Sequence, residues 1–544
     1  MFAVGRYRCD DRDKRYCQTT GTALPERKEQ RMNLKIVFYL ILVIQTAVSA
    51  AMLGAGLLSF CMDPFPDAAK MTACALVLLF LTGSLAILLR PKNELERKAG
   101  MREGFAIVGL SWLTATLIGL IPYMVVCGMY FPDAFFETAS GFSTTGSSVI
   151  DSKLVLMNGA TLPHGVESLP YGILFWRSLT QWLGGMGIVV LSLAILPLMN
   201  IGGQLLYNAE VSGIKSMESK IAPRIADAAK ILWLVYVLMT LTQTLILLCC
   251  GMDWFDALNH SMTTLATGGF STKQASISYW NSPVIQWVMI VFMVIAGCNF
   301  ALHFQFFRGN LSVYKKDEEL RFYLIIIVIA SILISASLYF CGTASPDVLS
   351  GTEYRGELSR SIRAGLFQVV SIITTSGFAT GDYNVWPGAA CVVIFILMFI
   401  SACGGSTTGG IKCVRILLIG KYAYSEIRRC LFPHQLQDIR INHIRCENST
   451  IQKTIGFCAM FMMLVFLFAL LVALVTPGIS LEVAFSSSVT ALANIGPGFG
   501  EIGPAGTHGW MPATAKVILG LEMLLGRLEL YTMLVFLLPG FWRR

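Results

Sequence analysis

The chain has 544 residues, of which 55% are apolar and only 14% are charged. Soluble domains usually carry about 25% charged residues, so this composition excludes an ordinary globular protein and predicts a membrane protein with many spans. The net charge of +8 does not indicate nucleic-acid binding, because the basic residues lie in short segments between apolar stretches. The 15 cysteines lie mostly inside apolar runs and lack zinc-ligand spacing, so we predict no disulfide framework and no structural metal.

Taken in order, the chain starts with a polar segment, residues 1–31, that lacks the apolar core of a signal peptide. We predict that it is a disordered cytosolic tail, or a mis-assigned start that precedes a true start at Met32. About ten apolar stretches then reach a length that crosses a bilayer. They are 35–61, 68–90, 104–130, 170–200, 226–250, 281–306, 320–341, 386–420 (interrupted), 452–476 and 512–541.

The charge of the connecting segments alternates along the chain. Four connections are basic: 90–98, 215–230, 308–321 and 412–453. The connections that alternate with them are neutral or acidic: 61–69, 151–170, 253–256 and 345–357. Because basic loops stay on the cytosolic side of a membrane, this alternation predicts that both termini are cytosolic.

Four short apolar segments end in turns rich in small residues, and each lies between two long apolar stretches. They are 133–147, 256–270, 365–378 and 483–497. Aligned without gaps, they place four glycines in one column, which we call the register glycines: Gly146, Gly269, Gly377 and Gly496. A second column upstream holds Phe135, Leu258, Leu366 and Phe485. Each segment is too short to span, so we predict four half-helices, and the charge alternation makes all four enter from the outer face.

These turns have a chemistry that suits a cation. Backbone that leaves a helix at membrane depth must line water or be buried in protein. Four glycine-containing turns around one axis would present a ring of carbonyl oxygens that replaces the hydration shell of the ion. The C-terminal ends of the half-helices would add partial negative charge at the same point. Threonine and glycine also mark ordinary helix contacts, but four copies in one register favour a cation filter.

A second irregular segment interrupts the eighth apolar stretch. Its residues are too rich in glycine to hold a stiff helix: Gly404, Gly405, Ser406, Thr407, Thr408, Gly409 and Gly410. Arg527 lies inside the last apolar stretch, where an ionisable residue indicates a functional site. We expect Arg527 to lie below the filter and to form a gate with this segment, since a positive charge there opposes cations. The alternatives are a local pair with Glu522 or Glu529, or a side chain that reaches toward the cytosol.

Other polar residues in the apolar stretches have weaker patterns. Arg177 and Gln181 are predicted either to hold the filter from behind or to serve helix packing and capping. Asn299 and His303 are predicted to be satisfied interior polar groups rather than metal ligands.

Several motifs together resemble the Trk/Ktr/HKT superfamily of potassium transporters, and within it the bacterial TrkH/TrkG group. The motifs lie at 175–187, 209–211, 223–230, 268–272, 297–300, 404–415, 494–498, 526–529 and 541–543. The resemblance covers about residues 32–544. It implies a potassium-selective pore, usually a homodimer in which each protomer has its own path, with K⁺ as the transported ion and no organic cofactor in this chain.

The resemblance also implies which residues line the path. In the family, the two residues before each filter glycine contribute ion-coordinating carbonyls. The implied filter is Thr144, Thr145, Gly146, Thr267, Gly268, Gly269, Thr375, Ser376, Gly377, Asn494, Ile495 and Gly496. The family's intramembrane gating loop corresponds to 404–410 and its gating arginine to Arg527. The fourth copy reads Asn-Ile-Gly-Pro without a nearby threonine, so we expect only approximate fourfold symmetry.

A cytosolic partner of the TrkA type, which binds NAD and ATP, is implied by the resemblance as well. This chain has no phosphate-binding loop of the GxxxxGK[ST] type, so nucleotide control must come from another chain. The basic connections at 215–224 and 421–453 are candidate docking surfaces.

The predicted fold is an all-α membrane protein, with two leading helices and four span–pore-helix–span repeats around a central ion pore. Its predicted parts are a tail (1–31), a leading helix pair (32–100), pore repeat 1 (101–204), pore repeat 2 (205–310), pore repeat 3 with the gating loop (311–425), and a cytosolic loop with pore repeat 4 (426–544). The predicted function is low-affinity potassium uptake across the bacterial inner membrane, without an enzymatic reaction. The alternatives are a K⁺ symporter coupled to H⁺ or Na⁺, the ion-translocating subunit of a K⁺-pumping ATPase, and a non-transporting scaffold.

Overall fold

A computed structural model describes residues 32–92, 100–195, 225–310, 312–343, 349, 353–433, 438–442 and 444–542 of the chain. The predicted tail at 1–31, the motif at 209–211 and the candidate docking surface at 215–224 lie outside these residues.

The described residues form many helices and one short hairpin. The longer helices are α2 (Leu34–Met62), α3 (Phe65–Leu88), α4 (Met101–Gly119), α6 (Phe131–Phe142), α7 (Tyr171–Ile195), α9 (Ile225–Cys249), α10 (Trp254–Leu265), α11 (Pro283–Ala296), α14 (Glu318–Cys341), α15 (Leu358–Ile373), α16 (Gly388–Leu397), α17 (Cys413–Leu431), α18 (Asn448–Val475), α19 (Leu481–Ala493) and α20 (Ala513–Arg527). The short helices are α5 (Ile121–Val125), α12 (Phe300–Phe307), α13 (Val313–Lys316), α21 (Tyr531–Leu534) and α22 (Pro539–Trp542). The 3-10 turns are η2 (Gly165–Ser168), η3 (Ser276–Trp280), η4 (Tyr383–Val385), η5 (Gly500–Ile502) and η6 (Val535–Leu537). The hairpin pairs β1 (Arg440–Ile441) with β2 (Ile444–Arg445) in antiparallel register.

Six helices in the described part of the chain are long and apolar enough to cross a membrane, and the bent pair α11–α12 would make a seventh. The remaining predicted crossings fall on α7, on α16 with α17, and on α20. Apart from the small hairpin, this is the predicted all-α membrane architecture.

The prediction that 281–306 forms one continuous span is wrong. The helix stops after Ala296, and α11 and α12 meet at an angle of 97°. Asn299 starts the second helix, because its side-chain oxygen accepts from the N–H of Ala301 at 2.8 Å. The cap at Asn299 therefore marks where the second helix begins.

The last predicted span, 512–541, is also shorter than expected. Its helix α20 ends at Arg527, and Glu529 and Leu530 follow with φ of 56° and 54°. This left-handed conformation costs free energy for an L-residue, and a right-handed helix cannot continue through it.

The predicted basic loop at 421–453 contains regular structure. The helix α17 extends into it, and the hairpin of β1 and β2 precedes α18.

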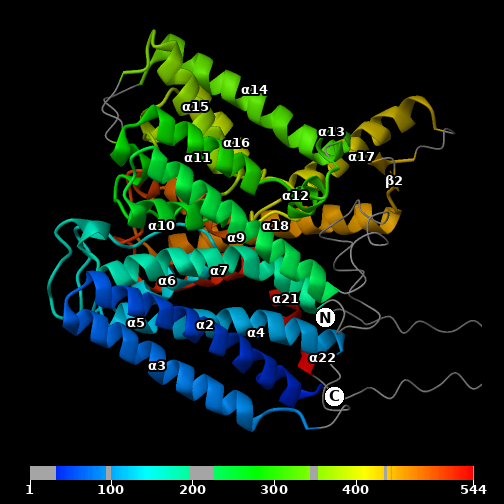
Figure 1. Cartoon of the computed structure of the whole chain (residues 1–544). Coiled ribbons are helices and arrows are strands. Elements are labelled where there is room, and N and C mark those ends of the chain that lie inside the picture. Colours follow the sequence, from blue (N-terminus) through cyan, green and yellow to red (C-terminus); the bar gives the residue numbers. More distant parts are fainter. Residues whose placement is uncertain are drawn as a thin grey trace, which may run out of the picture.

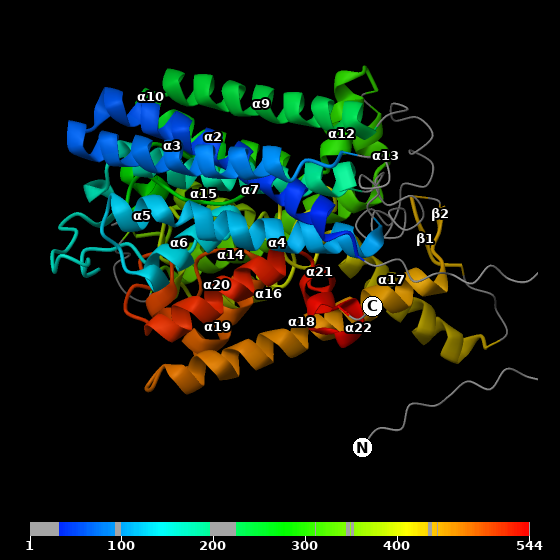
Figure 2. The ribbon, with the colours of Figure 1, turned by 90° about the horizontal axis from the view of Figure 1, so that it is seen from below.

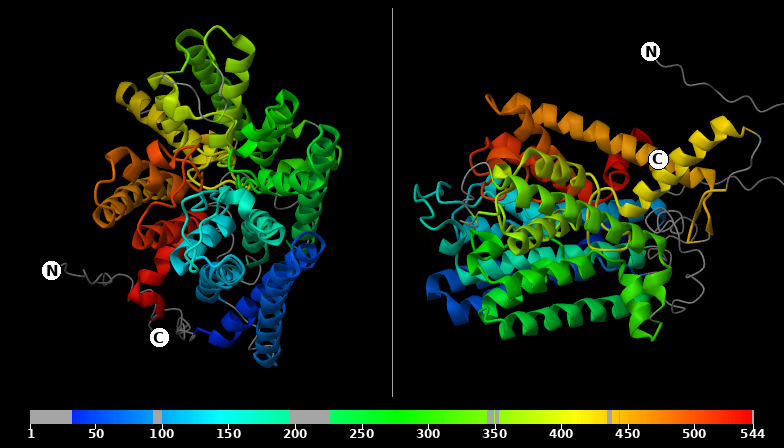
Figure 3. Two further views of the ribbon diagram at one scale, coloured as in Figure 1. Left: turned by 90° about the vertical axis from the view of Figure 1, so that its left-hand side faces the viewer. Right: turned by 90° about the horizontal axis from the view of Figure 1, so that it is seen from above.

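All four predicted half-helices are present as α6, α10, α15 and α19. Figure 3 (left) looks along the bundle, and the colours succeed one another around its centre, from cyan through green and yellow to orange. The leading helices α2 and α3 pack against each other outside this circle. The sequence repeats therefore correspond to four structural units arranged around one centre.

The two ends of the bundle differ. The helices α12, α13, α17 and α22 and the hairpin gather at one end, where the chain is predicted to be basic (Figure 1). The connection between α18 and α19 lies at the opposite end, and α9 and α18 flank the bundle on opposite sides (Figure 2). The half-helix α19 thus enters from the end opposite to the predicted cytosolic connections.

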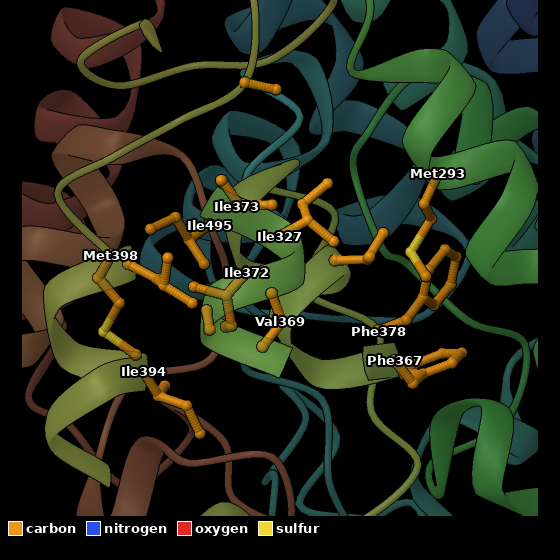
Figure 4. Packing of buried hydrophobic residues seen from close by; sticks show 14 of the residues in the cluster. Met293, Ile327, Phe367, Val369, Ile372, Ile373, Phe378, Ile394, Met398 and Ile495 are labelled. Atoms are coloured by element: carbon orange, nitrogen blue, oxygen red, sulfur yellow. The ribbon is translucent and has the colours of Figure 1, made fainter. Parts of the chain in front are cut away.

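The C-terminal part of the half-helix α15 is enclosed by protein. Its buried Phe367, Val369 and Ile372 belong to one apolar cluster with Met293 of α11 and Ile327 of α14 (Figure 4). Because lipid cannot satisfy backbone polar groups, a helix that ends at membrane depth needs such an enclosure. The packing therefore fixes where the turn after α15 lies.

Candidate functional site

The four half-helices end in the same turn. Two positions before each register glycine the backbone is left-handed, at Thr144 (φ 55°), Thr267 (φ 54°), Thr375 (φ 52°) and Asn494 (φ 57°). The following N–H donates at 2.9 Å to the carbonyl five residues earlier, from Thr145 to Ser140, Gly268 to Thr263, Ser376 to Ser371 and Ile495 to Thr490. This is the Schellman ending of a helix, which turns the chain away from the axis. The conformation is costly for a β-branched threonine, so its recurrence indicates a functional constraint.

The register glycines form a closed ring of contacts. All four have φ between 74° and 104°, and a Cβ built on any of them would lie within 2.8 Å of a carbonyl oxygen from another repeat. The contacts run in one direction: Gly146 faces the oxygen of Gly268, Gly269 that of Ser376, Gly377 that of Ile495, and Gly496 that of Thr145. Each oxygen belongs to the residue directly before a register glycine. The structure therefore brings the predicted filter residues of all four repeats together around one axis.

A cavity of about 90 Å³ opens on the ring, and its lining includes all four register glycines. Arg177, Lys273 and His508 also line it. The first two of these face carboxylates, since Arg177 lies 2.7 Å from Glu137 and Lys273 lies 3.8 Å from Asp256. The cavity thus has a polar wall that leads to the ring.

Gln181 of α7 supports the second turn by hydrogen bonds. Support of the filter is one of the two roles predicted for this residue; the other is helix packing or capping. Its side-chain N–H donates to the carbonyl of Gly268 at 2.7 Å, and its oxygen accepts from the N–H of Phe270 at 3.0 Å. A Cβ at Gly268 would lie 2.4 Å from this amide. The second turn therefore needs two successive glycines, one for the ring and one for Gln181.

Arg177 joins the first turn to the second. Its guanidinium donates to Glu137 at 2.8 Å and to the carbonyl of Ser271 at 3.0 Å, and it lies over the ring of Phe270 at 4.1 Å. Glu137 also accepts from the N–H of Val149 at 3.1 Å. Both charged side chains are buried, with 3% and 0% of their surface exposed. This pair connects two repeats at the level of the filter.

We expect Arg177→Leu to lower the free energy of unfolding by about 3–5 kcal/mol, because it leaves the Glu137 carboxylate buried without its cation. Thermal unfolding of the purified protein in detergent, followed by intrinsic fluorescence, measures the effect. The matched control is Lys70→Ala, which removes an exposed pair of 3.6 Å with Asp67 and should cost less than about 1 kcal/mol. Equal shifts for the two variants would contradict a structural role for the buried pair.

The predicted gating loop, 404–410, lies on the inner side of the ring. The N–H of Gly409 donates to the hydroxyl oxygen of Thr375 at 3.2 Å. The hydroxyl oxygens of Thr407 and Thr267 are 3.3 Å apart, and a Cβ at Gly409 would lie 2.7 Å from the side-chain oxygen of Asn494. One loop therefore touches three of the four filter turns.

Both ends of this loop are tied to neighbouring helices. Glu319 of α14 accepts from the N–H of Gly404 at 2.6 Å and from the N–H of Val414 at 3.0 Å. The break between α11 and α12 supplies further partners. The carbonyl of Gly297 accepts from the N–H of Cys403, directly before the loop, at 3.0 Å, and the N–H of Phe300 donates to the loop carbonyl of Gly405 at 3.0 Å. Two interrupted spans thus satisfy one another's backbone groups inside the protein, as membrane depth requires.

Arg527 lies beside the loop, as predicted. It is 2% exposed, and its guanidinium donates to the carbonyl of Thr407 at 2.6 Å and to the carbonyl of Gly184 at 3.1 Å. Of the two carboxylates considered as local partners, Glu522 accepts from Ser488 at 2.5 Å. The other, Glu529, binds the cations described next. Arg527 therefore connects the loop to α7, beside the position that the sequence predicts for a gate.

Glu529 links the end of α20 to the far end of the loop. Its carboxylate lies 2.6 Å from Arg415 and 3.3 Å from Lys412. Its own backbone and that of Leu530 are left-handed, so the chain adopts a strained turn that places this carboxylate. Arg527 therefore binds the loop itself, and Glu529, two residues later, binds the segment that directly follows the loop.

The sequence patterns assign no role to Glu137 or Glu319, and they offer Glu529 only as a local partner of Arg527, not as the partner of Lys412 and Arg415. Glu137 stands as an ionisable residue inside an apolar half-helix, which is a usable signal. Glu319 lies one residue before the predicted stretch 320–341 and inside the predicted basic connection 308–321, where a charged residue carries no signal. His303 is an interior polar group, as predicted, with its ring nitrogens 2.7 Å from Tyr314 and 2.9 Å from the carbonyl of Ile295.

Comparison with known proteins finds a matching family model and several similar proteins. Residues 70–541 match the family model TrkH, described as a cation transport protein. The Trk system potassium uptake protein TrkH of Halomonas elongata is 38% identical over 465 residues, which cover 85% of this chain and 90% of that protein. TrkH of Escherichia coli strain K12 is 39% identical over 456 residues, 83% of this chain and 88% of that protein. TrkG of the same strain is 30% identical over 472 residues, 86% and 90% of the two chains.

A solved structure agrees with the fold. The crystal structure of the potassium transporter TrkH from Vibrio parahaemolyticus superimposes with a TM-score of 0.80 at 32% identity. The alignment covers 94% of this chain and 100% of that one.

Proposed function

Because this chain belongs to the TrkH family of cation transport proteins, we propose that it takes up potassium across the bacterial inner membrane. In this proposal, the ion passes at low affinity through a K⁺-selective pore that the intramembrane loop gates. The Trk system potassium uptake proteins that resemble it support potassium as the ion.

The closed ring of the register glycines carries the proposal. It supports a site in which neutral carbonyl oxygens from all four repeats surround one cation: those of Thr145, Gly268, Ser376 and Ile495. Carbonyl rings bind monovalent cations by replacing their hydration shell, with no formal charge at the site. The C-terminal ends of α6, α10, α15 and α19 add partial negative charge toward the same axis.

The same arrangement explains how uptake proceeds without an ATP site in this chain. A membrane potential that is negative inside contributes about 2.3 kcal/mol per charge for each 100 mV. A selective pore therefore accumulates K⁺ as long as the cell maintains the potential. The loop at 404–410 and Arg527 close the inner side of the ring and supply the gate.

We also propose the assembly and regulation that the family suggests. Two chains form a homodimer, and a cytosolic protein of the TrkA type, which binds NAD and ATP, controls the gate. The end of α17 supports a docking surface, because it exposes the apolar Ile427 and Leu431 beside Arg428 and Arg429. Both termini then lie on this cytosolic side.

Uptake of ⁸⁶Rb⁺ in a bacterial strain that lacks its own potassium uptake systems tests the proposal. We expect this chain to restore uptake and growth at low external K⁺, and an absence of rescue by a protein that reaches the membrane would instead support a non-transporting scaffold. Single-channel currents recorded from the purified chain in a bilayer would support the gated pore. A fixed stoichiometric flux of H⁺ or Na⁺ would favour the symporter, and inhibition by vanadate would favour a subunit of an ATPase.

A further inference from the structure

A surface outside the pore joins exposed apolar side chains to exposed cations, at the end of the bundle where α12 and α13 lie (Figure 1). The helix α12 is bent by 97° from α11 and packs against α9, so it runs across the end of the bundle rather than along it (Figure 2). Its last two residues, Phe306 and Phe307, are exposed. Exposed aromatic residues on a helix with this orientation are typical of a segment that lies in the membrane interface.

Four exposed cations follow these phenylalanines: Arg308, Lys315, Lys316 and Arg321. Among the residues that the structure describes, none of these four forms an ion pair. The guanidinium of Arg308 lies over the ring of Phe304 at 5.5 Å, and the Nε of Arg321 donates to the carbonyl of Asp317 at 3.3 Å. These contacts orient the two arginines, but they supply no carboxylate to balance the charge.

The acidic residues between these cations are engaged by other parts of the protein. Asp317 accepts from the side-chain amide of Asn442 at 2.9 Å, and Glu318 pairs with Lys421. Glu319 is buried and accepts from the backbone at both ends of the intramembrane loop. The carboxylates are therefore separated from the cations, and the exposed surface is more positive than the composition of the stretch indicates.

Exposed apolar residues continue from Arg321 along α14, one of the helices long enough to cross a membrane. Four of them are 54–62% exposed: Ile325, Val328, Ile329 and Ile332. They follow Arg321 at helical spacing, so they form one stripe on the same face of the helix. Ile332 lies eleven positions after Arg321, which is about 16 Å at 1.5 Å per residue. The hydrocarbon of one leaflet is about 15 Å thick, so the stripe matches the length of the acyl chains of a lipid.

We propose that these four cations bind the headgroup phosphate of an anionic phospholipid, whose acyl chains lie along the α14 stripe. The guanidinium groups of Arg308 and Arg321 match the geometry of a phosphate, and the two lysines add point charges. A soluble acidic partner would account for the cations but not for the apolar stripe that begins beside Arg321. The site lies outside the ion path, and it goes beyond the proposed function because it depends on no property of the transported ion.

Native mass spectrometry of the full chain in detergent, with phosphatidylglycerol or phosphatidylcholine added, tests this site. We expect the anionic lipid to bind about tenfold more tightly or better, because each cation near an anionic headgroup contributes a factor of about five. Lys315→Gln/Lys316→Gln/Arg321→Gln should therefore weaken binding of phosphatidylglycerol about 100-fold. Lys315→Arg/Lys316→Arg/Arg321→Lys keeps all three charges and should bind within about twofold of the unmodified chain, which shows that the loss comes from charge.

The matched control removes three exposed cations elsewhere at the same end of the bundle. Arg429→Gln/Arg440→Gln/Arg445→Gln affects arginines that each face a carboxylate and have no such stripe beside them, so binding should not change. An equal loss in this control, or equal binding of the two lipids, would overturn the site. Displacement of the lipid by inorganic phosphate or by a polyglutamate peptide would indicate a soluble anionic partner and would also overturn it. The assay measures no ion flux, so its outcome is independent of the proposed function.

Discussion

Arg527→Ala is expected to raise potassium flux through the partner-free protein about 10- to 100-fold. The guanidinium holds the loop carbonyl of Thr407 and the carbonyl of Gly184, which lies on α7. Each hydrogen bond from a charged group contributes about 1.5–3 kcal/mol, and 1.4 kcal/mol is a factor of ten in an equilibrium. The substitution also removes a buried positive charge from the inner end of the path, which lowers the electrostatic barrier to a cation.

Liposomes loaded with K⁺ and diluted into ⁸⁶Rb⁺ give the basal flux directly. Arg527→Lys should give an intermediate flux, because lysine keeps the charge but cannot donate to two carbonyls in a fixed fork. The matched control is Arg363→Ala, which removes an arginine hydrogen bond of 2.7 Å between Arg363 of α15 and Gln286 of α11. Wild-type flux and wild-type regulation in Arg527→Ala would remove this residue from the gate.

The arrangement of the filter could be predicted because its cause is local and repeated. A half-helix that ends in a left-handed turn followed by a glycine requires a particular short sequence pattern. This pattern occurs four times, at Gly146, Gly269, Gly377 and Gly496. The alignment therefore identified the residues whose backbones have positive φ in the structure. The glycine-rich loop was recognisable for the same reason, since no helix is stable through four glycines in seven residues.

The supports of the site could not be predicted because their partners are distant in sequence. Glu319 accepts from residues 85 and 95 positions away, and no local pattern marks such a pair. The break after Ala296 lies in an apolar run, where hydropathy detects no interruption. The left-handed turn at Glu529 contains neither glycine nor proline, and the ion pairs with Lys412 and Arg415 account for it. Tertiary contacts, rather than propensity, decide these elements.

Gly146→Ser and Gly377→Ser are expected to lower the K⁺ over Na⁺ permeability ratio about tenfold or more. A Cβ at Gly146 would lie 2.1 Å from the carbonyl oxygen of Gly268, and one at Gly377 would lie 2.3 Å from that of Ile495. Real Cβ atoms do not approach oxygen this closely, so the neighbouring carbonyl must move. Overpacking of this kind costs about 1–3 kcal/mol. Here the clash displaces the carbonyl oxygens that are proposed to select the ion.

A serine at a register glycine has two effects: backbone strain from the positive φ, and a clash of its Cβ with a carbonyl oxygen. We expect the clash, and not the strain, to lower the permeability ratio, and Gly251 separates the two effects. Gly251 has φ of 90°, yet a Cβ there would have no atom within 4 Å. Gly251→Ser therefore imposes the same left-handed strain without a clash, and its permeability ratio should equal that of the unmodified chain. Bi-ionic reversal potentials measure all three variants under the same conditions. If the ratio falls equally in Gly251→Ser, or stays unchanged in the two ring variants, then the ring of register glycines does not select the ion.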